Sequence, residues 1–390
     1  MTKKNIVIAG GGFAGVSALE RLDRHRPAIG KDYDIILIDK RDCFEFLPML
    51  PDVAGGWLKP ERLRISLAEL AHKHRCKFIK GEIKALDLKK QRFNVDDSSI
   101  NYDYAIISSG SETNFYNNQN AEKACFKLDN VDNALAIKDE LLKRIKSPDT
   151  INAVVIGGGY TGIEIATNMR FLLSSAKAKF RLYIIEKSEE MLTMVPEWIR
   201  AYVRNQLQNA QIEIICRDSL KEHDGKDAIL ESGFRIKNAF CVWAAGVKTP
   251  QFVETLDLAK ERTRVKVDAR LYVADSGYNN IFIAGDAASF TEKATGRPLR
   301  MAVMFSVGQG KIAAENIINS IVKKPVLEYN PVDLGYLVPM ATGTAPGIVL
   351  GKNVRGFSGY ALHYLMCAHR SAFRNKAGII KDMLWKKKGA

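Results

Sequence analysis

The sequence lacks the features that would indicate a metal-binding, secreted or membrane-spanning protein. Its six cysteines show neither C-x-x-C nor metal-ligand spacing, which is typical of a protein in a reducing compartment without a zinc site. No run of 18 or more apolar residues exists, so we expect no spanning helix. The uncharged stretch 334–351 is long enough, but its two prolines and four glycines make it a poor candidate. We expect no signal peptide, because MTKKN runs straight into an apolar strand.

Acidic residues are scarce relative to basic ones. The 390-residue chain has 44 Asp and Glu against 58 Lys and Arg, a formal net charge of +14. From Arg355 onward, eight Lys or Arg face one acid, Asp382, so a net +7 lies in the last 36 residues. A basic balance alone is compatible with nucleic acid, anionic lipid or simple solubility. Its concentration at one end indicates a local basic surface, on a chain long enough for two or three domains.

Two glycine loops follow apolar, β-branched runs. Both have G-x-G-x-x-G spacing and consist of Gly10, Gly12 and Gly15, and of Gly157, Gly159 and Gly162. In this pattern the first glycine allows a tight turn, the second lets backbone N–H groups approach a pyrophosphate, and the third lets helix and strand pack closely. The phosphate then lies at the positive end of a helix dipole. One such loop is often an ordinary turn, so the repetition is the stronger signal.

An acid ends the next strand after each loop. Asp39 lies 29 residues after Gly10, and Glu186 lies 29 residues after Gly157. The usual offset to a ribose-binding acid is about 20 residues, so each first helix or its following loop is predicted to be extended. The identical offset in both halves predicts two dinucleotide sites.

Three further segments lie next to predicted strands, at positions where a nucleotide-binding domain could contact its ligand. Residues 40–58 cannot form one regular helix, because they contain Pro48 and Pro51. They are either a hydrophobic loop over the sheet or a wall against a flat aromatic cofactor. A buried strand runs into the turn SSGS, which contains Gly110, and another ends in WAAGV, where a glycine would let a ligand lie against the backbone.

A later apolar strand stops at Gly285, Asp286 and Ala287. This places a carboxylate at the carboxyl end of a strand, where open α/β sheets bind ligands. The alternative is a strand-end turn capped by aspartate, but two preceding glycine loops favour a binding role. The first domain is therefore predicted to resume near Ile281, followed by a helix at 301–321.

The remaining elements are predicted from periodicity and turn signals. We expect helices at 66–74, 131–145, 163–174 and 197–208, and strands at 212–216 and 240–244. Residues 76–100 alternate in polarity and are predicted to form a small antiparallel meander.

Taken in order, four motifs resemble the two-dinucleotide flavoprotein superfamily: GGGFAG at 10–15, GGGYTGIE at 157–164, AAGV at 244–247 and AGDAA at 284–288. Within it, the loop after Asp39, with Phe46, Pro48 and Leu50, is similar to that of type II NADH dehydrogenases, the single-subunit, non-pumping NADH:quinone oxidoreductases. The resemblance covers nearly the whole chain, although only the glycine loops and the GD turn are highly specific.

The resemblance implies an α/β fold with two Rossmann-like, glutathione-reductase-like domains and a C-terminal amphipathic helical membrane-anchoring segment. The implied parts are an FAD-binding domain at 1–115 and 270–330, an NADH-binding domain at 150–250, and a membrane-association or dimer segment at 331–390.

The resemblance also implies which residues hold each nucleotide. FAD would contact Gly10, Gly12, Gly15, Asp39, Pro48, Gly110, Asp286 and Ala287. NADH would contact Gly157, Gly159, Gly162, Glu186, Ala245 and Gly246. Asp39 would accept ribose hydroxyls and Asp286 would bind the ribityl chain. Glu186 would repel the 2′-phosphate of NADPH, a preference that Lys187 weakens, and no metal is expected.

Glu164 is the predicted catalytic residue. It lies two residues past Gly162 and one turn into the helix, which in such enzymes is close to the nicotinamide and the flavin. NADH would pass a hydride to the flavin, so the hard chemistry belongs to the cofactors. Glu164 is either a helix-dipole carboxylate or a positioning or proton-relay group, and the second interpretation is favoured.

The electron acceptor is less well marked than the donor. The quinone-side glutamine motif of type II dehydrogenases aligns with VMFSVG, where its glutamines become Met304 and Gly308, with Gln309 adjacent. Disulfide reductases of this superfamily need a C-x-x-C or C-x-x-x-x-C pair beside the flavin, and the absence of both spacings argues against a dithiol relay. A sulfide:quinone-type reaction would have to use Cys125 and Cys367, which are better explained as small buried hydrophobes.

The C-terminal segment has an apolar stripe with basic flanks. The stripe includes Phe357, Tyr364 and Leu365, and Trp385 precedes the lysines 386–388. An interfacial helix needs this pattern, although a helix docked on its own domain or on a dimer partner would also show it. We expect peripheral association with the cytoplasmic face of the inner or cell membrane, a possible homodimer, and no nucleic acid.

The predicted function is transfer of a hydride from NADH to FAD and then of electrons to a membrane quinone. One alternative is a sulfide:quinone-type or other flavoprotein reductase with a different donor or acceptor. The other is a redox-gated binding protein similar to apoptosis-inducing flavoproteins, against which the apolar stripe of the tail argues.

Overall fold

A computed structural model describes residues 3–370, 378–379 and 381–382. The chain forms two compact units, each assembled from three separate stretches. Among the described residues, the first contains 3–44, 65–112 and 248–333, and the second contains 45–64, 113–247 and the residues from 334 onward.

The first unit is built on a parallel sheet with strand order β21-β9-β1-β2-β5. Its strands are β1 (Lys4–Ala9), β2 (Tyr33–Asp39), β5 (Lys77–Lys80), β9 (Tyr104–Ile107) and β21 (Ile281–Ile283). Consecutive apolar residues make up the central strands because both faces of a parallel sheet are covered; Ile6, Val7 and Ile8 are fully buried. Strand β21 pairs with β9, so the chain near Ile281 belongs to the sheet of the first unit, which resumes at residue 248.

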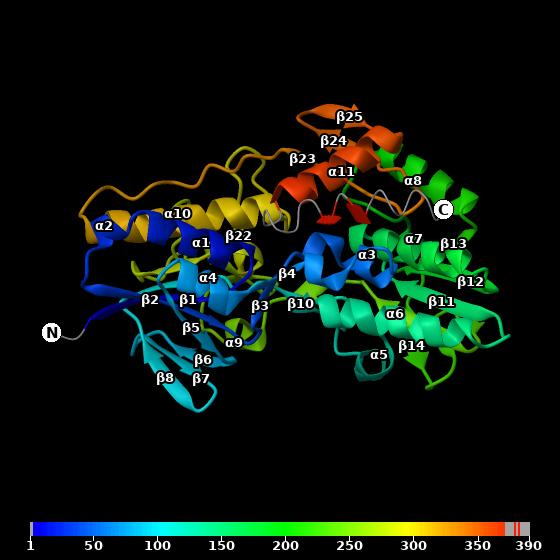
Figure 1. Cartoon of the computed structure of the whole chain (residues 1–390), viewed down its shortest axis with the longest axis horizontal. Helices are drawn as coiled ribbons and strands as arrows, with labels where there is room; N and C mark the ends of the chain where they lie inside the picture. Colours follow the sequence, from blue (N-terminus) through cyan, green and yellow to red (C-terminus); the bar gives the residue numbers. More distant parts are fainter. Residues whose placement is uncertain (1–2, 371–377, 380, 383–390) are drawn as a thin grey trace. The chain divides into compact units, whose positions relative to one another are not determined.

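Helices cover this sheet. The long helices α1 (Phe13–Arg24) and α10 (Val303–Ile321) lie side by side and contact strands of the sheet (Figure 1). Shorter helices of the unit are α2 (Arg26–Ile29), α4 (Leu67–Lys73), α9 (Gln251–Glu254) and the 3-10 helix η3 (Gly285–Ala287). The helices predicted at 66–74 and 301–321 are therefore confirmed.

The expected meander is only partly present. Strands β6 (Ile83–Asp87), β7 (Arg92–Val95) and β8 (Ser98–Asn101) form an antiparallel sheet. The preceding strand β5 instead pairs in parallel with β2, Ile36 opposite Lys77 and Asp39 opposite Lys80. The prediction was wrong for residues 77–80, because a four-residue strand carries no signal that separates parallel from antiparallel pairing. A second small sheet contains β19 (Lys260–Glu261), β20 (Arg264–Val267) and β22 (Ala288–Phe290).

The second unit repeats the parallel arrangement. Its sheet has the order β13-β12-β11-β17, with β11 (Ile151–Ile156), β12 (Phe180–Glu186), β13 (Ile212–Cys216) and β17 (Ala239–Trp243). Its helices include α5 (Gln119–Ala124), α6 (Val131–Ile145), α7 (Tyr160–Ser175) and α8 (Glu197–Asn209). The helices expected at 131–145, 163–174 and 197–208 and the strands expected at 212–216 and 240–244 are confirmed.

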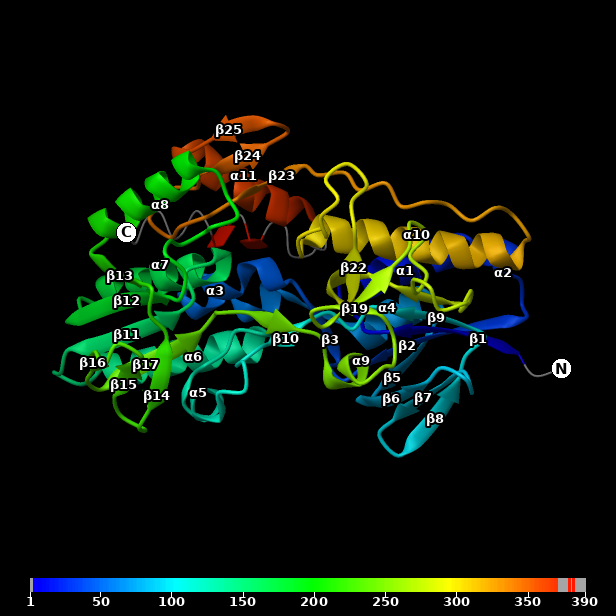
Figure 2. The same ribbon diagram turned by 180° about the vertical axis from the view of Figure 1, so that it is seen from behind.

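Smaller elements complete the second unit. An antiparallel sheet of β14 (Leu220–His223), β15 (Ala228–Leu230) and β16 (Arg235–Ile236) is labelled in Figure 2. The segment after Asp39 forms the 3-10 helix η1 (Leu47–Met49), α3 (Leu50–Ala54) and η2 (Pro60–Arg62). After residue 333 come the antiparallel strands β23 (Gly335–Leu337), β24 (Gly347–Val349) and β25 (Lys352–Val354), and then α11 (Gly356–Arg370).

Short strands mark the places where the chain passes between the units. They are β3 (Cys43–Glu45), β4 (Arg64–Ser66), β10 (Glu112–Thr113) and β18 (Val247–Lys248).

Candidate functional site

Each glycine loop joins the central strand of a parallel sheet to a helix. The chain turns at Gly10 and Gly157, whose φ angles are +114° and +110°, values that favour glycine. At Gly15, an added Cβ atom would lie 1.9 Å from the carbonyl oxygen of Gly10, and at Gly162 one would lie 1.8 Å from the carbonyl oxygen of Gly157. Helix and loop therefore touch in both units, as the spacing predicts.

The amino ends of both helices are left free for an anion. Gly12 precedes α1 and Gly159 precedes α7, and neither helix has a side-chain cap or an acid in its first turn. A Cβ atom at Gly12 or Gly159 would meet nothing within 4 Å. Uncapped N–H groups at the positive end of a helix dipole, beside open space, fit the pyrophosphate of a dinucleotide.

The acid at the end of the second strand is bonded to its own glycine loop in both units. Asp39 accepts from the Gly11 amide through Oδ2 at 2.7 Å and from the Arg41 amide through Oδ1 at 2.8 Å. Glu186 accepts from the Gly158 amide through Oε2 at 2.7 Å and from the Ser188 amide through Oε1 at 2.7 Å. These hydrogen bonds fix the two carboxyl groups beside the loops. The equal offsets in the sequence thus correspond to equal geometry.

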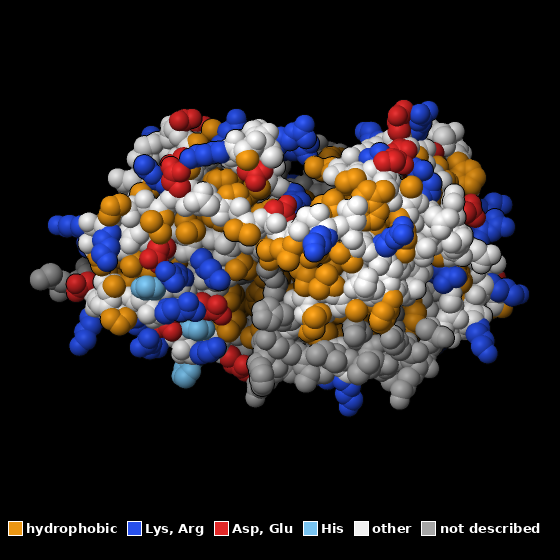
Figure 3. Space-filling view, turned by 90° about the horizontal axis from the view of Figure 1, so that it is seen from above, with side chains coloured by type: hydrophobic (Ala, Val, Ile, Leu, Met, Phe, Trp, Pro, Cys, Tyr) orange, Lys and Arg blue, Asp and Glu red, His pale blue; other side chains and the backbone are white. Residues whose placement is uncertain are grey.

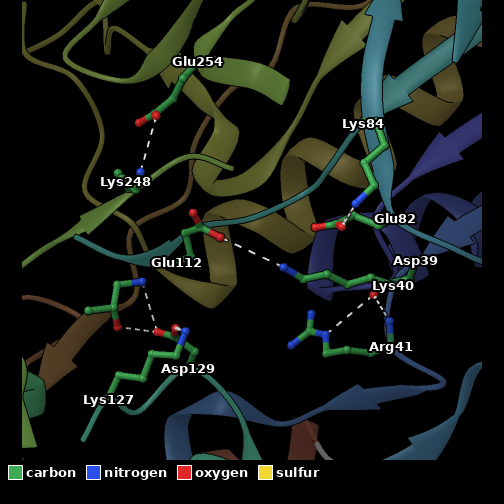
Figure 4. A network of polar contacts seen from close by, with 11 residues as sticks. Asp39, Lys40, Arg41, Glu82, Lys84, Glu112, Lys127, Asp129, Lys248 and Glu254 are labelled. Carbon is green, nitrogen blue, oxygen red and sulfur yellow. Dashed lines mark hydrogen bonds and ion pairs between the residues drawn. The ribbon is translucent and has the colours of Figure 1, made fainter. Parts of the chain in front are cut away.

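A cavity of about 300 Å³ adjoins Asp39 in the first unit. It is lined by Gly10, Asp39, Lys40, Arg41, Ser109 and Glu112, among others. Figure 4 shows the polar groups around it: Arg41 points to Asp39, and Lys40 reaches Glu112 at 4.0 Å. The buried Ser109 hydroxyl has no hydrogen-bond partner among the described residues. A polar cavity lined by charged groups of both signs, with a spare hydroxyl, fits the adenosine half of a dinucleotide.

A second carboxylate of the first unit lies in the turn after β21. Asp286 accepts from the Ser111 hydroxyl at 2.9 Å. Burial raises the pKa of Asp286, while the Ser111 hydrogen bond and the Arg264 charge oppose that rise. Arg264 donates to the carbonyls of Leu299 and Ala288, and its Nε has no partner among the described residues. Ala287 is fully buried beside Asp286.

The second unit contains a larger cavity of about 730 Å³. Gly157, Gly159, Glu186, Lys187, Ala245 and Gly246 all line it, so the predicted NADH-binding residues other than Gly162 meet at one opening. Tyr116 also lines it, lies over Gly246, and donates its hydroxyl to the Ala245 carbonyl at 3.1 Å. Gly162 lies behind the loop, where it touches Gly157.

Glu164 is a partly buried acid of α7, at the start of its second turn. Burial and the nearby charge of Asp52, in that order, raise its pKa well above the usual range. A carboxyl group in this environment holds a proton more readily than a surface glutamate. A strongly perturbed carboxyl group marks a candidate functional residue, and the role of Glu164 stays a prediction.

The remaining predicted residues fall in different surroundings. Gln309 is buried on α10, where its side-chain oxygen accepts from the Gly285 amide at 2.7 Å, so it supports the turn that carries Asp286. Gly308 packs under Tyr329, and Met304 is half-buried. Their role in quinone binding stays a prediction. Gly110 turns with φ +70°, and Pro48 belongs to the second unit, in η1.

None of the six cysteines, all of them in the described part of the chain, is in a disulfide. All six are free, and the two best candidates have separate partners in the described structure: Cys125 interacts with Cys241, and Cys367 lies 3.6 Å from His363 Nε2. No group of three His, Cys, Asp or Glu within the described ranges could hold a metal ion.

Much of the C-terminal segment lies outside the described residues. The apolar stripe is described only as far as α11, where Tyr364 is buried while Phe357 and Leu365 are more than half exposed. Trp385 and the lysines 386–388 are not described. Figure 3, which views the side bearing β24, β25 and α11, shows hydrophobic side chains next to Lys and Arg. No helix within the described ranges is long and apolar enough to span a membrane.

Sequence reasoning missed several residues of these sites. Arg264, Tyr116 and Asp52 carry no motif, because each reaches its site only through the tertiary fold. The backbone amides that bind Asp39 and Glu186 could have been anticipated, since both acids end strands next to the loop strands.

A family model for pyridine nucleotide-disulphide oxidoreductases matches residues 4–310 of this chain. A type II NADH:quinone oxidoreductase from Staphylococcus saprophyticus is 23% identical over 372 residues, covering 91% of this chain and 92% of its own. A homologue of the same description from Staphylococcus aureus is 22% identical over 379 residues, with the same coverage.

Solved structures share the fold. NDH2 from Plasmodium falciparum, solved in complex with NADH, superimposes with a TM-score of 0.88 at 17% identity, covering 99% of this chain and 98% of that one. The sulfide:quinone oxidoreductase of Aquifex aeolicus gives a TM-score of 0.80 at 20% identity, covering 96% and 92%.

Proposed function

Because this chain belongs to the pyridine nucleotide-disulphide oxidoreductase family, we propose that it is an FAD-dependent NADH:quinone oxidoreductase. The observation that carries the proposal is the duplicated site. Each unit has an uncapped helix amino end beside a glycine loop whose central amide binds a strand-end carboxylate. Two such sites suit one bound dinucleotide cofactor and one dinucleotide substrate.

FAD is assigned to the first unit. Gly12 and the amino end of α1 would hold the pyrophosphate, and Asp39 would accept the ribose hydroxyls. Asp286, with Ser111 beside it, would bind the ribityl chain. The burial of Asp286 and its hydrogen bond with Ser111 favour this role. FAD supplies the two-electron chemistry that amino-acid side chains lack.

NADH is assigned to the second unit. Gly159 and the amino end of α7 would hold its pyrophosphate, and Glu186, fixed by two backbone amides, would meet the adenosine ribose. The fixed negative charge disfavours the 2′-phosphate of NADPH. Lys187 lines the same cavity, so discrimination is predicted to be incomplete.

Glu164 is assigned the role of proton-holding or positioning residue. Burial and the Asp52 charge raise its pKa, so it holds a proton more readily than a surface glutamate does. Glu164→Gln should slow steady-state turnover at least tenfold, about 1.4 kcal/mol of barrier, and should leave the flavin content unchanged. An unaltered turnover rate in a fully flavinated variant would end this assignment.

Quinone is proposed as the acceptor because the curated relatives that align over 91% of the chain are NADH:quinone oxidoreductases. A sulfide:quinone-type reaction has less support, since Cys125 and Cys367 have separate partners. The test is NADH oxidation by the purified flavoprotein with and without a soluble quinone analogue. Quinone-dependent oxidation of NADH supports the proposal, whereas oxidation of sulfide but not of NADH contradicts it.

The protein is further proposed to bind the cytoplasmic face of the membrane peripherally through its C-terminal segment, with a homodimer as a possible assembly and no nucleic-acid partner. Support comes from the half-exposed Phe357 and Leu365 and from the net charge of the last 36 residues. Each Lys or Arg near an anionic leaflet contributes about 1 kcal/mol. Replacing Lys386, Lys387 and Lys388 by Gln should strongly reduce co-sedimentation with anionic vesicles; undiminished sedimentation would contradict this part.

A further inference from the structure

A second buried carboxylate of the second unit lies close to Glu164. Asp52 of α3 is only 3% exposed. Its Oδ1 accepts from the Tyr364 hydroxyl at 2.9 Å and from Asn168 Nδ2 at 3.3 Å. Buried carboxylates are costly unless they are hydrogen-bonded, and the two donors offset part of that cost. Helices α3, α7 and α11 thus each contribute a side chain to one polar cluster.

Asn168 ties this cluster to the helical turn that carries Glu164. Its Nδ2 donates to the Glu164 carbonyl at 3.0 Å as well as to Asp52. Its Oδ1 accepts from Trp57 Nε1 at 3.0 Å, which fixes the orientation of the amide. A Cβ atom on Gly55 would lie 2.6 Å from the same Oδ1, so the loop after α3 closes tightly over Asn168. Asp52 is therefore held in a fixed place relative to Glu164.

The titratable groups that α11 places around the cluster are neutral near pH 7. Burial raises the pKa of Tyr360 and of Tyr364, and the charge of Asp52 raises both further. Burial lowers the pKa of His363 to about 4. Among the described groups of α3 and α11, Asp52 is therefore the charged group that acts on Glu164.

We propose that Asp52 is a positioning residue for the reaction: fixed by Tyr364 and Asn168 beside the helical turn that carries Glu164, it favours the form of Glu164 that is ready to donate a proton. This inference rests on the proposed function. In the overall reaction, NADH + H⁺ + quinone → NAD⁺ + quinol, the hydride supplies two electrons and one proton, so the quinol needs one further proton from the medium. Glu164 donates that proton and is reprotonated from solvent, and Asp52 is unchanged.

The test is the pH dependence of turnover in Asp52→Asn. In the plot of kcat against pH, activity should fall where Glu164 loses its proton, and we call this part of the curve the Glu164-dependent limb. Removing the Asp52 charge should lower the apparent pKa of this limb. A shift of about one unit would reduce kcat about tenfold above that limb, change it little at lower pH, and leave the KM for NADH unchanged. The matched control is Asp132→Asn, an exposed acid of the same unit that pairs with Arg64; its pH profile should equal that of the parent.

Tyr364→Phe provides a second variant if Asp52→Asn folds poorly. It removes one of the two donors that stabilise the Asp52 carboxylate, so Asp52 should take up a proton more readily and the limb should move in the same direction by a smaller amount. Thermal unfolding and flavin content are measured for every variant. A uniform loss of activity with an unmoved limb in both variants would assign Asp52 a structural role only and overturn the proposal.

Infrared titration of the holoenzyme separates this inference from the proposed function. The parent should show a protonated-carboxyl C=O band near neutral pH that Glu164→Gln removes and that titrates at lower pH in Asp52→Asn. This band does not depend on the electron acceptor. If it is absent from the parent or unmoved in Asp52→Asn, the proposal fails even if quinone is reduced; if it behaves as predicted but quinone is not reduced, only the proposed function fails.

Discussion

Gly159→Ala should separate the folding role of the second glycine loop from its binding role. The residue has φ −80°, which alanine adopts freely, and a Cβ atom there meets nothing within 4 Å. Such a replacement commonly stabilises a protein by about 0.4–1 kcal/mol, because it restricts the unfolded chain. The same methyl group would project into the space assigned to the NADH pyrophosphate.

The expected loss of affinity follows from the contacts at the helix end. If the methyl group prevents one charge-assisted hydrogen bond to phosphate, about 1.5–3 kcal/mol is lost, and the KM for NADH should rise about 10- to 100-fold. Gly162→Ala is the contrasting variant. Its Cβ atom would lie 1.8 Å from the Gly157 carbonyl oxygen, so it should destabilise the fold by about 1–3 kcal/mol.

The assay pairs thermal unfolding with NADH-dependent turnover at fixed flavin content. Gly159→Ala should keep or raise the free energy of unfolding while weakening the binding of NADH. Gly162→Ala should lower the free energy of unfolding. An unchanged KM for NADH in Gly159→Ala would refute the placement of the pyrophosphate.

Two further predictions concern pH and stability. Burial raises the pKa of Asp286 above its ordinary value of 3.8. The unfolding free energy of the flavin-free protein should therefore fall as pH rises above 3.8 towards the raised folded-state pKa. Asp286→Asn should remove this fall and weaken flavin retention, which denaturant titrations at several pH values and flavin content check. The pKa of His363 is lowered from 6.5 to about 4, so stability should be lost as pH falls between these values, and His363→Gln should flatten that dependence.

The duplicated strand, glycine turn and helix could be predicted because their signals are local. An apolar strand, a glycine turn and a strand-end acid at the same offset are all readable along the chain, and the structure places Asp39 and Glu186 on equivalent amides. Helices with clear caps were located closely: α6 begins after Asn130, whose side chain accepts from the Asn133 amide, and ends at Ile145 as expected.

The parts that could not be predicted depend on contacts distant in sequence. Strand β5 is only four residues long, and its parallel pairing with β2 is decided by the sheet. Asp52 lies in an irregular, proline-containing segment and gains its partners from residues more than 100 positions away. Gln309 stands beside an expected quinone motif, yet its side chain is bonded to the Gly285 amide, which no spacing rule indicates.

The most direct measurement is anaerobic. Purified yellow protein is mixed with one equivalent of NADH, and then with a quinone analogue, while the flavin absorbance is recorded. The proposed function predicts bleaching by NADH and full recovery of the oxidised spectrum on adding quinone, with much weaker bleaching by NADPH. A flavin that NADH does not bleach, or that stays reduced in the presence of quinone, would contradict it.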